Sequence, residues 1–124
     1  GGGVPVPEVH RTDGVDADLI VYLTARPIDV GGETIAYSGH CEQEQGGRPI
    51  AAHFNWSPRH LPAAPDAWTV RYLVRVAMHE LTHALVFSEA LLAQFPTPDG
   101  ALTKVSTPAG TSAAASMLIC GSNP

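Results

Sequence analysis

The sequence predicts an α+β fold, because short strand-like segments precede one long helical segment. The strand-like segments, at residues 19–25, 34–40 and 49–56, are rich in β-branched and aromatic residues. In residues 66–87, by contrast, apolar residues recur at the three- and four-residue spacing of a helix face. The 124 residues are 44% apolar and 15% charged, which is ordinary for a globular protein and argues against disorder of the whole chain. We therefore expect one domain with a hydrophobic core.

The predicted strands lie in the N-terminal half. Residues 1–14 combine glycine and proline with alternating valines, so we expect a flexible or edge-packed entry segment. The mostly apolar run 19–25 predicts a buried strand, and a Gly-Gly pair then predicts a turn. Residues 34–40 and 49–56 predict two further strands, joined by a polar loop at 42–47.

The long helix is predicted over residues 66–87. Asp66 follows a proline and suits the N-cap position, and no residue after it breaks the helical pattern. Trp68 and Tyr72, one turn apart, are expected to pack in the core or in the wall of a cleft. Beyond the helix, the alanine-rich residues 108–119 predict a short second helix. The apolar residues that predict a buried face, on the side away from two histidines, are Val70, Leu73, Val74, Ala77, Leu81, Ala84 and Leu85.

The segment His79-Glu80-Leu81-Thr82-His83 has the spacing of a zinc-protease motif. At about 100° per residue, two histidines four positions apart lie about 40° apart around a helix, so both imidazoles can reach one metal ion. Zinc lowers the pKa of a bound water to about 7, and a neighbouring carboxylate can take its proton and pass it to a leaving amine. The motif therefore predicts peptide-bond hydrolysis, with His79 and His83 as zinc ligands and Glu80 as the catalytic residue.

Residues on both sides of the motif resemble the leishmanolysin-like zinc metalloproteases, which belong to the metzincins. The similar segments are residues 79–88 with Leu91, Leu92 and Phe95, and, upstream of them, residues 16–25, 35–41 and 47–51. Residues 105–120 are similar to a segment that the family places between its second and third zinc ligands. The resemblance implies a metzincin-like N-terminal catalytic subdomain, in which a small twisted mixed sheet packs on a long active-site helix.

The resemblance also implies an incomplete catalytic domain. Family members take a third zinc-binding histidine from beyond the segment that residues 105–120 resemble, and no histidine follows His83 here. We therefore expect a partial catalytic domain over residues 15–124, truncated before its C-terminal subdomain, with the third ligand beyond Pro124 and no activity in the 124-residue chain alone. Other metzincins have their third histidine at the position of Glu89. On a continuous helix, six residues turn Glu89 about 240° from His83, so we do not expect it to bind zinc.

Val86 departs from the family pattern, which has glycine where the active-site helix ends. A β-branched residue pays a steric penalty at positive φ, so either the helix continues through Phe87 or the turn uses a different backbone conformation. The departure gives weight to an alternative function, a catalytically inactive adhesion or binding module of the same fold. A third interpretation is an ordinary α+β domain in which the spacing of the motif is accidental.

The expected partners are extended polypeptide substrates. In metzincins an edge strand of the sheet pairs with the substrate, and the resemblance assigns this role to residues 34–39, in particular Ile35, Ala36, Tyr37 and Ser38. A plain edge or interior strand is the alternative. The net charge of −5 and the scattered basic residues argue against nucleic acid as a partner.

The sequence contains no stretch near the roughly 18 apolar residues that a membrane span requires. Family members are secreted or attached to membrane surfaces and are associated with cell adhesion and matrix degradation. The resemblance therefore implies an extracellular or cell-surface location, with surface attachment of the full-length protein as one form of it.

The two cysteines, Cys41 and Cys120, leave their pairing open. In family members Cys41 has a nearer partner, at the position that Ser57 occupies here, so we expect Cys41 to be free and Cys120 to pair outside this chain. His53 is similar in position to a structural metal ligand of matrix metalloproteases. The acidic residues that follow in those enzymes are absent, so we expect a hydrogen-bonded strand histidine instead.

Overall fold

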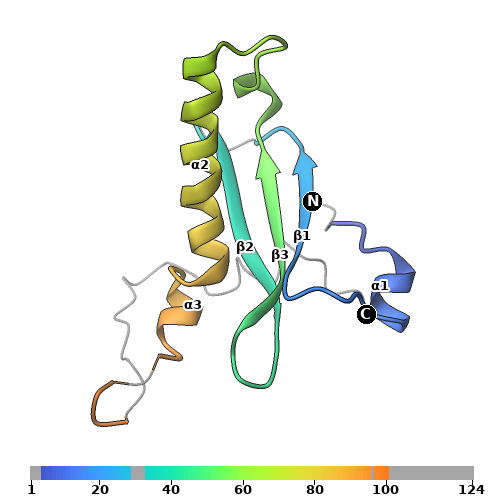
Figure 1. The fold of residues 1–124 in the computed structure, drawn as a ribbon, viewed down its shortest axis with the longest axis vertical. Helices are drawn as coiled ribbons and strands as arrows, with labels where there is room; N and C mark the ends of the chain where they lie inside the picture. Colours follow the sequence, from blue (N-terminus) through green and yellow to red (C-terminus); the bar gives the residue numbers. More distant parts are fainter. Residues whose placement is uncertain (1–3, 29–32, 96, 101–124) are drawn as a thin grey trace.

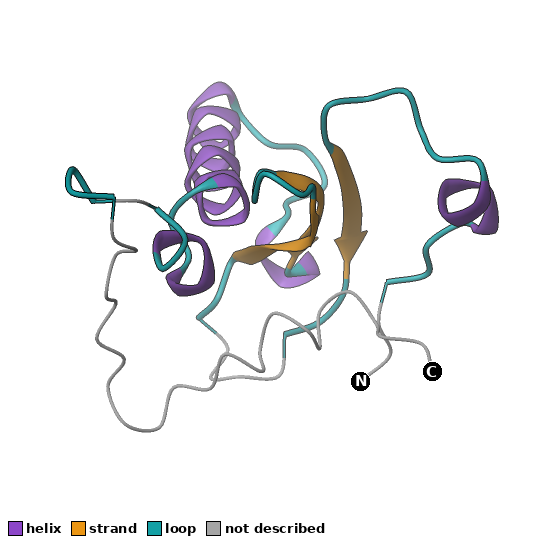
Figure 2. Ribbon diagram, turned by 90° about the horizontal axis from the view of Figure 1, so that it is seen from below, coloured by secondary structure: helices purple, strands orange, loops and turns teal. Residues whose placement is uncertain are grey.

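The computed structural model describes residues 4–28, 33–95 and 97–100. Its elements, in chain order, are α1 (Glu8–Thr12), β1 (Ile20–Ala25), β2 (Ala36–Gln43), β3 (Pro49–Trp56), a 3-10 turn (Pro58–His60), α2 (Ala67–Leu85) and α3 (Glu89–Leu92). The long helix α2 lies alongside β2 and also contacts β3. The short helix α1 lies beyond β1, past the other edge of the sheet (Figures 1 and 2). A small sheet with helices confirms the α+β prediction.

The three described strands form a mixed sheet in the order β1-β3-β2. β1 pairs with β3 in parallel, and β2 pairs with β3 in antiparallel fashion, so β3 is central. The β2–β3 register shifts between His40 and Glu42, which leaves Cys41 as an extra residue in a bulge. β2 continues to Gln43, since Glu42 and Gln43 still pair with β3. The sequence had predicted that these two residues belong to the connecting loop. β2 is thus one edge of the described sheet.

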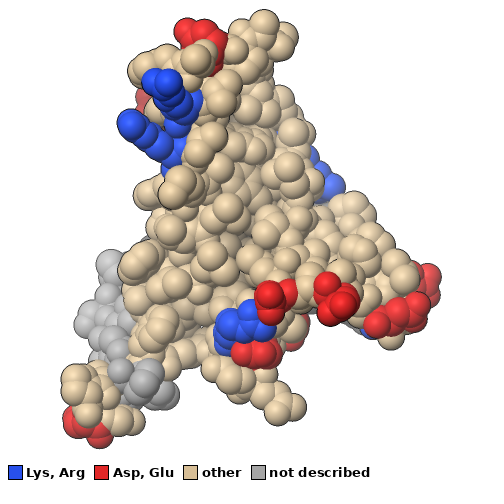
Figure 3. All heavy atoms as spheres, viewed as in Figure 1, with Lys and Arg blue, Asp and Glu red and all other residues tan. Residues whose placement is uncertain are grey.

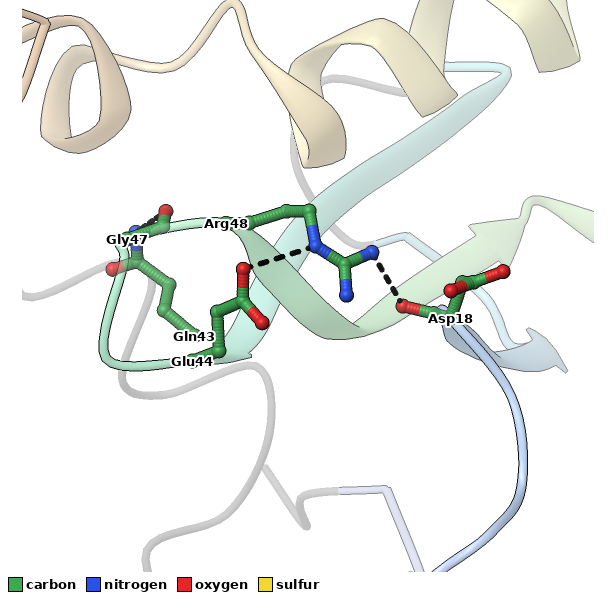
Figure 4. Close-up of polar contacts among 5 residues, drawn as sticks. All are labelled: Asp18, Gln43, Glu44, Gly47 and Arg48. Carbon is green, nitrogen blue, oxygen red and sulfur yellow. Dashed lines mark hydrogen bonds and ion pairs between the residues drawn. The ribbon is translucent and has the colours of Figure 1, made fainter.

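Polar contacts tie the β2–β3 turn to the chain that enters β1 (Figure 4). Gly47 has φ +84°, a conformation that favours glycine, and its carbonyl accepts a bond from the Gln43 side chain. Arg48 Nε donates to Glu44 Oε1 over 3.1 Å, and Arg48 Nη1 donates to the carbonyl of Asp18 over 3.0 Å. These contacts couple the hairpin to the start of the parallel strand.

A buried hydrogen-bond network joins β1 to β3. The Asn55 side chain is fully buried. Its Oδ1 accepts hydrogen bonds from Thr24 Oγ1 over 2.7 Å and from Arg26 N over 2.9 Å. Its Nδ2 donates to the Arg26 carbonyl over 3.0 Å. Because the Thr24 hydroxyl proton is used on Asn55, His53 Nε2 is the donor in its 2.7 Å bond to Thr24 Oγ1. Burial, with a smaller contribution from Arg26, lowers the pKa of His53. The prediction of a hydrogen-bonded strand histidine is confirmed.

The expectation that both faces of residues 19–25 are buried is wrong. The side chains of β1 alternate between half-buried and exposed, and Val21 and Leu23 are 38% and 67% exposed. The reason is position: β1 is the second edge of the described sheet, while α2 packs against β2 and β3. Strand composition identified the strand, and its place in the sheet determined its exposure.

Helix α2 begins as predicted and is much less buried than predicted. Asp66 is its N-cap, and Asp66 Oδ1 accepts from Thr69 N over 2.7 Å. Hydrogen bonding to Thr69, through its side chain first and its backbone second, lowers the pKa of Asp66. Trp68 and Tyr72 are not core residues; their rings stack at 5.7 Å with an interplanar angle of 3°, and Trp68 is 71% exposed. One sheet can cover only one face of a helix, so these α2 side chains remain exposed: Trp68, Val70, Tyr72, Val74, Met78 and Leu85.

Three other local features were not predicted from the sequence. The expected entry segment contains the helix α1, and residues after α2 form α3, whose N-cap Ser88 accepts from Leu91 N over 3.3 Å. Cys41 is disulfide-bonded, so the prediction of a free Cys41 is wrong. The predictions for Cys120 and for a helix at 108–119 lie outside the described residues.

Candidate metal site and cleft

His79 and His83 lie one turn apart on α2, and their rings converge. The ring centroids are 4.8 Å apart, and the two Nε2 atoms are 3.1 Å apart. Two nitrogens bound to one tetrahedral zinc ion, at about 2.0–2.1 Å each, are about 3.3 Å from one another. The observed separation of the two Nε2 atoms therefore fits a shared zinc ion with only a small change in side-chain torsions.

A second hydrogen bond defines the tautomer of His83. Its Nδ1 lies 2.7 Å from the carbonyl oxygen of Phe87. A carbonyl only accepts, so Nδ1 carries the proton and the Nε2 lone pair of the neutral ring is available on the side facing His79. Metal-binding histidines commonly donate their other ring N–H in this way, which holds the ring in the orientation that ligation requires.

The backbone at the end of α2 makes this bond possible. The helix ends at Leu85, and the N–H groups of Val86 and Phe87 both donate to the carbonyl of Thr82, over 2.9 and 2.8 Å. Val86 adopts φ −142° and ψ −57°, so its φ is negative. Of the two outcomes that the sequence left open, the turn uses a different backbone conformation, and valine occupies it without the penalty of positive φ.

Val86→Gly is therefore expected to leave zinc affinity unchanged, within about twofold, in the full-length protein. Glycine has greater conformational freedom in the unfolded chain, so the substitution should instead lower the free energy of unfolding by about 0.5–1 kcal/mol. Calorimetric zinc titration and urea denaturation measure the two effects. A large gain in zinc affinity would show that valine distorts the turn.

A cleft of about 410 Å³ lies between the start of β2 and the middle of α2. His79 and Glu80 line it, as do two of the four residues predicted to bind substrate, Ile35 and Ala36. The other two do not: the Ser38 hydroxyl donates to the His53 carbonyl over 2.9 Å, and the Tyr37 ring contacts the His53 ring edge-on at 5.6 Å. The remaining lining residues are Glu33, Thr34, Arg75 and Val76.

Glu80 is half-buried in this cleft beside the exposed His79. Within the described ranges, its carboxylate has neither a hydrogen-bond nor an ion-pair partner. An unpaired carboxylate next to a converging pair of imidazoles is free to accept and return a proton.

The part of the chain that the structure describes provides two candidate zinc ligands. No group of three or more His, Cys, Asp or Glu side chains there is arranged to hold a metal ion. Glu89 is exposed and opens α3 after the break at Val86, so the rotation expected for a continuous helix does not apply to it. It nevertheless does not join His79 and His83.

Sequence reasoning did not select Arg75, Val76 or Glu33 as cleft residues, whereas Thr34 belongs to the segment 34–39 that the resemblance assigns to substrate binding. A signal existed for Arg75, which lies four residues before His79 and hence on nearly the same face of α2. No sequence spacing identifies Glu33, because only the packing of β2 against α2 brings it to the cleft.

The candidate site consists of two histidines and one glutamate on a helix that lies beside the edge of a mixed sheet. This residue pattern on a helix is typical of metallopeptidases. The family model for leishmanolysin matches residues 1–117. A leishmanolysin-like peptidase of Drosophila melanogaster is 39% identical over 68% of this chain, and a leishmanolysin of Leishmania donovani is 35% identical over 70%. A ciliated left-right organizer metallopeptidase of Xenopus laevis is 31% identical over 77%. The chain therefore belongs to the leishmanolysin family of peptidases.

The matched region is a small part of these relatives. It spans 13%, 14% and 12% of the Drosophila, Leishmania and Xenopus proteins, respectively. No solved structure gives a significant match to the chain. None of the helices in the described ranges is long and apolar enough to cross a membrane.

Proposed function

We propose that this chain forms the zinc-binding helix and part of the substrate cleft of a zinc-dependent metalloendopeptidase. The observation that carries the proposal is the 3.1 Å separation of the His79 and His83 Nε2 atoms, with Glu80 in the adjoining cleft. Membership of the leishmanolysin family supports the reaction class. The small mixed sheet beside α2 is compatible with a metzincin-like N-terminal subdomain.

In the proposed mechanism, His79 and His83 would hold the metal, and the Phe87 carbonyl keeps the His83 ring oriented. Bound zinc would supply Lewis-acid activation of a water molecule and of the peptide carbonyl. Glu80 would take a proton from a water molecule that attacks the peptide carbonyl and would deliver it to the leaving amine, so that one carboxylate acts first as base and then as acid. Its lack of a partner among the described residues leaves it available for both steps.

The proposed substrate is an extended polypeptide that adds to the edge of the described sheet that β2 forms. An edge strand presents unpaired backbone N–H and C=O groups, which bind a peptide irrespective of most of its side chains. The start of β2 lies in the same cleft as His79 and Glu80, through Ile35 and Ala36. Backbone pairing there would hold the scissile bond beside the catalytic groups.

A catalytic zinc site normally has three protein ligands and one open position. We propose that a residue outside the described ranges completes the set, because two imidazoles alone would hold the ion weakly. We also propose an extracellular or cell-surface location. The disulfide at Cys41 supports it, since structural disulfides persist in oxidising compartments.

Metal removal tests the proposal. The full-length protein should cleave an unstructured substrate such as casein, lose this activity when a chelator has removed its zinc, and regain it on addition of one equivalent of zinc. Activity is followed by release of soluble peptides, and zinc content by mass spectrometry. Undiminished cleavage at zero zinc content would refute the mechanism. Zinc binding without any cleavage would favour the inactive binding module.

A further inference from the structure

Arg75 lies in the same cleft as His79 and Glu80, and among the described lining residues it is the only Lys or Arg. It is exposed, and within the described ranges no ion pair is recorded for it. Figure 3 shows basic side chains over the N-terminal half of α2, where Arg71 and Arg75 occur. Of these two, only Arg75 lines the cleft. An unpaired guanidinium beside the catalytic groups has the chemistry to bind a carboxylate of the substrate.

We infer that Arg75 selects substrates with an aspartate or glutamate close to the scissile bond, a specificity that rests on the proposed peptidase function. Ile35 and Ala36 also line the cleft, and their apolar side chains cannot compete for the guanidinium. Glu33 also lines the cleft but does not pair with Arg75 in the structure. A substrate carboxylate would therefore meet an available cation in a partly apolar setting.

The spacing along α2 determines which substrate residues can reach Arg75. Four residues of helix separate it from His79, a rise of about 6 Å. An extended peptide advances about 3.3 Å per residue, so the acidic side chain lies within one to three residues of the bond that is cleaved.

The direction of the strands determines the side of the scissile bond. β2 is antiparallel to β3, and Figure 1 shows α2 running in the same direction as β2. A peptide that pairs antiparallel with β2, the more stable arrangement per residue, runs opposite to α2. Its residues after the scissile bond then approach Arg75 and the N-terminal end of α2.

The test uses zinc-loaded full-length protein and a set of quenched peptides that carry Asp, Asn or Lys at each of the three positions on either side of the scissile bond. We expect Asp at one of the first three positions after the bond to give a kcat/KM about tenfold higher than Lys at the same position. An effect of this size lies between those typical of solvent-exposed ion pairs and of buried charged hydrogen bonds. Arg75→Gln should remove this preference and Arg75→Glu should reverse it. Arg71→Gln is the matched control and should retain it.

A binding measurement separates specificity from catalysis. In the Glu80→Gln protein, fluorescence anisotropy should show about tenfold tighter binding of the acidic peptide than of its Lys counterpart, and Arg75→Gln in that background should abolish the difference. Equal cleavage and equal binding of all peptides would overturn the role of Arg75 while leaving the peptidase proposal intact. If no peptide is cleaved, the peptidase proposal fails, and the binding difference still decides whether Arg75 selects acidic segments. Circular dichroism checks that each variant is folded.

Discussion

Glu80→Gln is expected to reduce peptide hydrolysis by about 100- to 10,000-fold while zinc remains bound. Glutamine preserves the size of the side chain, but its amide cannot take a proton from water and return it to an amine. Glu80 lies in the cleft beside His79 and has no partner within the described ranges, so its substitution should disturb no structural contact there. The measurements are kcat/KM for a quenched peptide and zinc content by mass spectrometry.

Glu89→Gln is a suitable control for this experiment. Glu89 is an exposed acidic residue outside the cleft, at the start of α3. Its substitution should leave both activity and zinc content unchanged. Loss of zinc from Glu89→Gln would identify Glu89 as the third ligand, and full activity in Glu80→Gln would remove Glu80 from the mechanism.

His79→Gln is expected to weaken zinc binding by more than about 100-fold. Even the loss of a residue that merely hydrogen-bonds to a metal ligand lowers metal affinity by about 10- to 100-fold. The reason is geometric: the Nε2 atoms of His79 and His83 are 3.1 Å apart, and removal of one leaves a single imidazole at this position. His79 is exposed, so the variant should remain folded. Calorimetric titration of the metal-free full-length protein with zinc gives the affinity.

His10→Gln is the matched histidine control. His10 lies on α1 and contacts Tyr22, with 3.1 Å between its Nδ1 and the tyrosine hydroxyl, and it has no place in the cleft. Its removal should leave zinc affinity unchanged. Equal zinc affinity in His79→Gln and the unsubstituted protein would show that the metal is held elsewhere.

The sequence alone was sufficient for features that depend on neighbouring residues. Strand β3 has the predicted bounds, Pro49–Trp56, and α2 begins after its predicted cap, Asp66. The i, i+4 spacing of His79 and His83 required only that the segment be helical, because the geometry of a helix then brings the rings to one side. Alternation, capping and helical periodicity are all expressed within a few residues, so a local pattern specifies them.

The tertiary structure determined what depends on distant residues. Strand β1 is half-exposed, and much of the apolar surface of α2 is uncovered, because burial depends on which faces meet and not on composition. The His83–Phe87 bond depends on a backbone turn at Val86 that the family pattern did not predict. The cleft itself joins Glu33 to Arg75, more than forty residues apart in sequence. Only the packing of α2 on β2 brings such residues together, which is why the motif could predict a candidate metal site whereas the cleft around it required the fold.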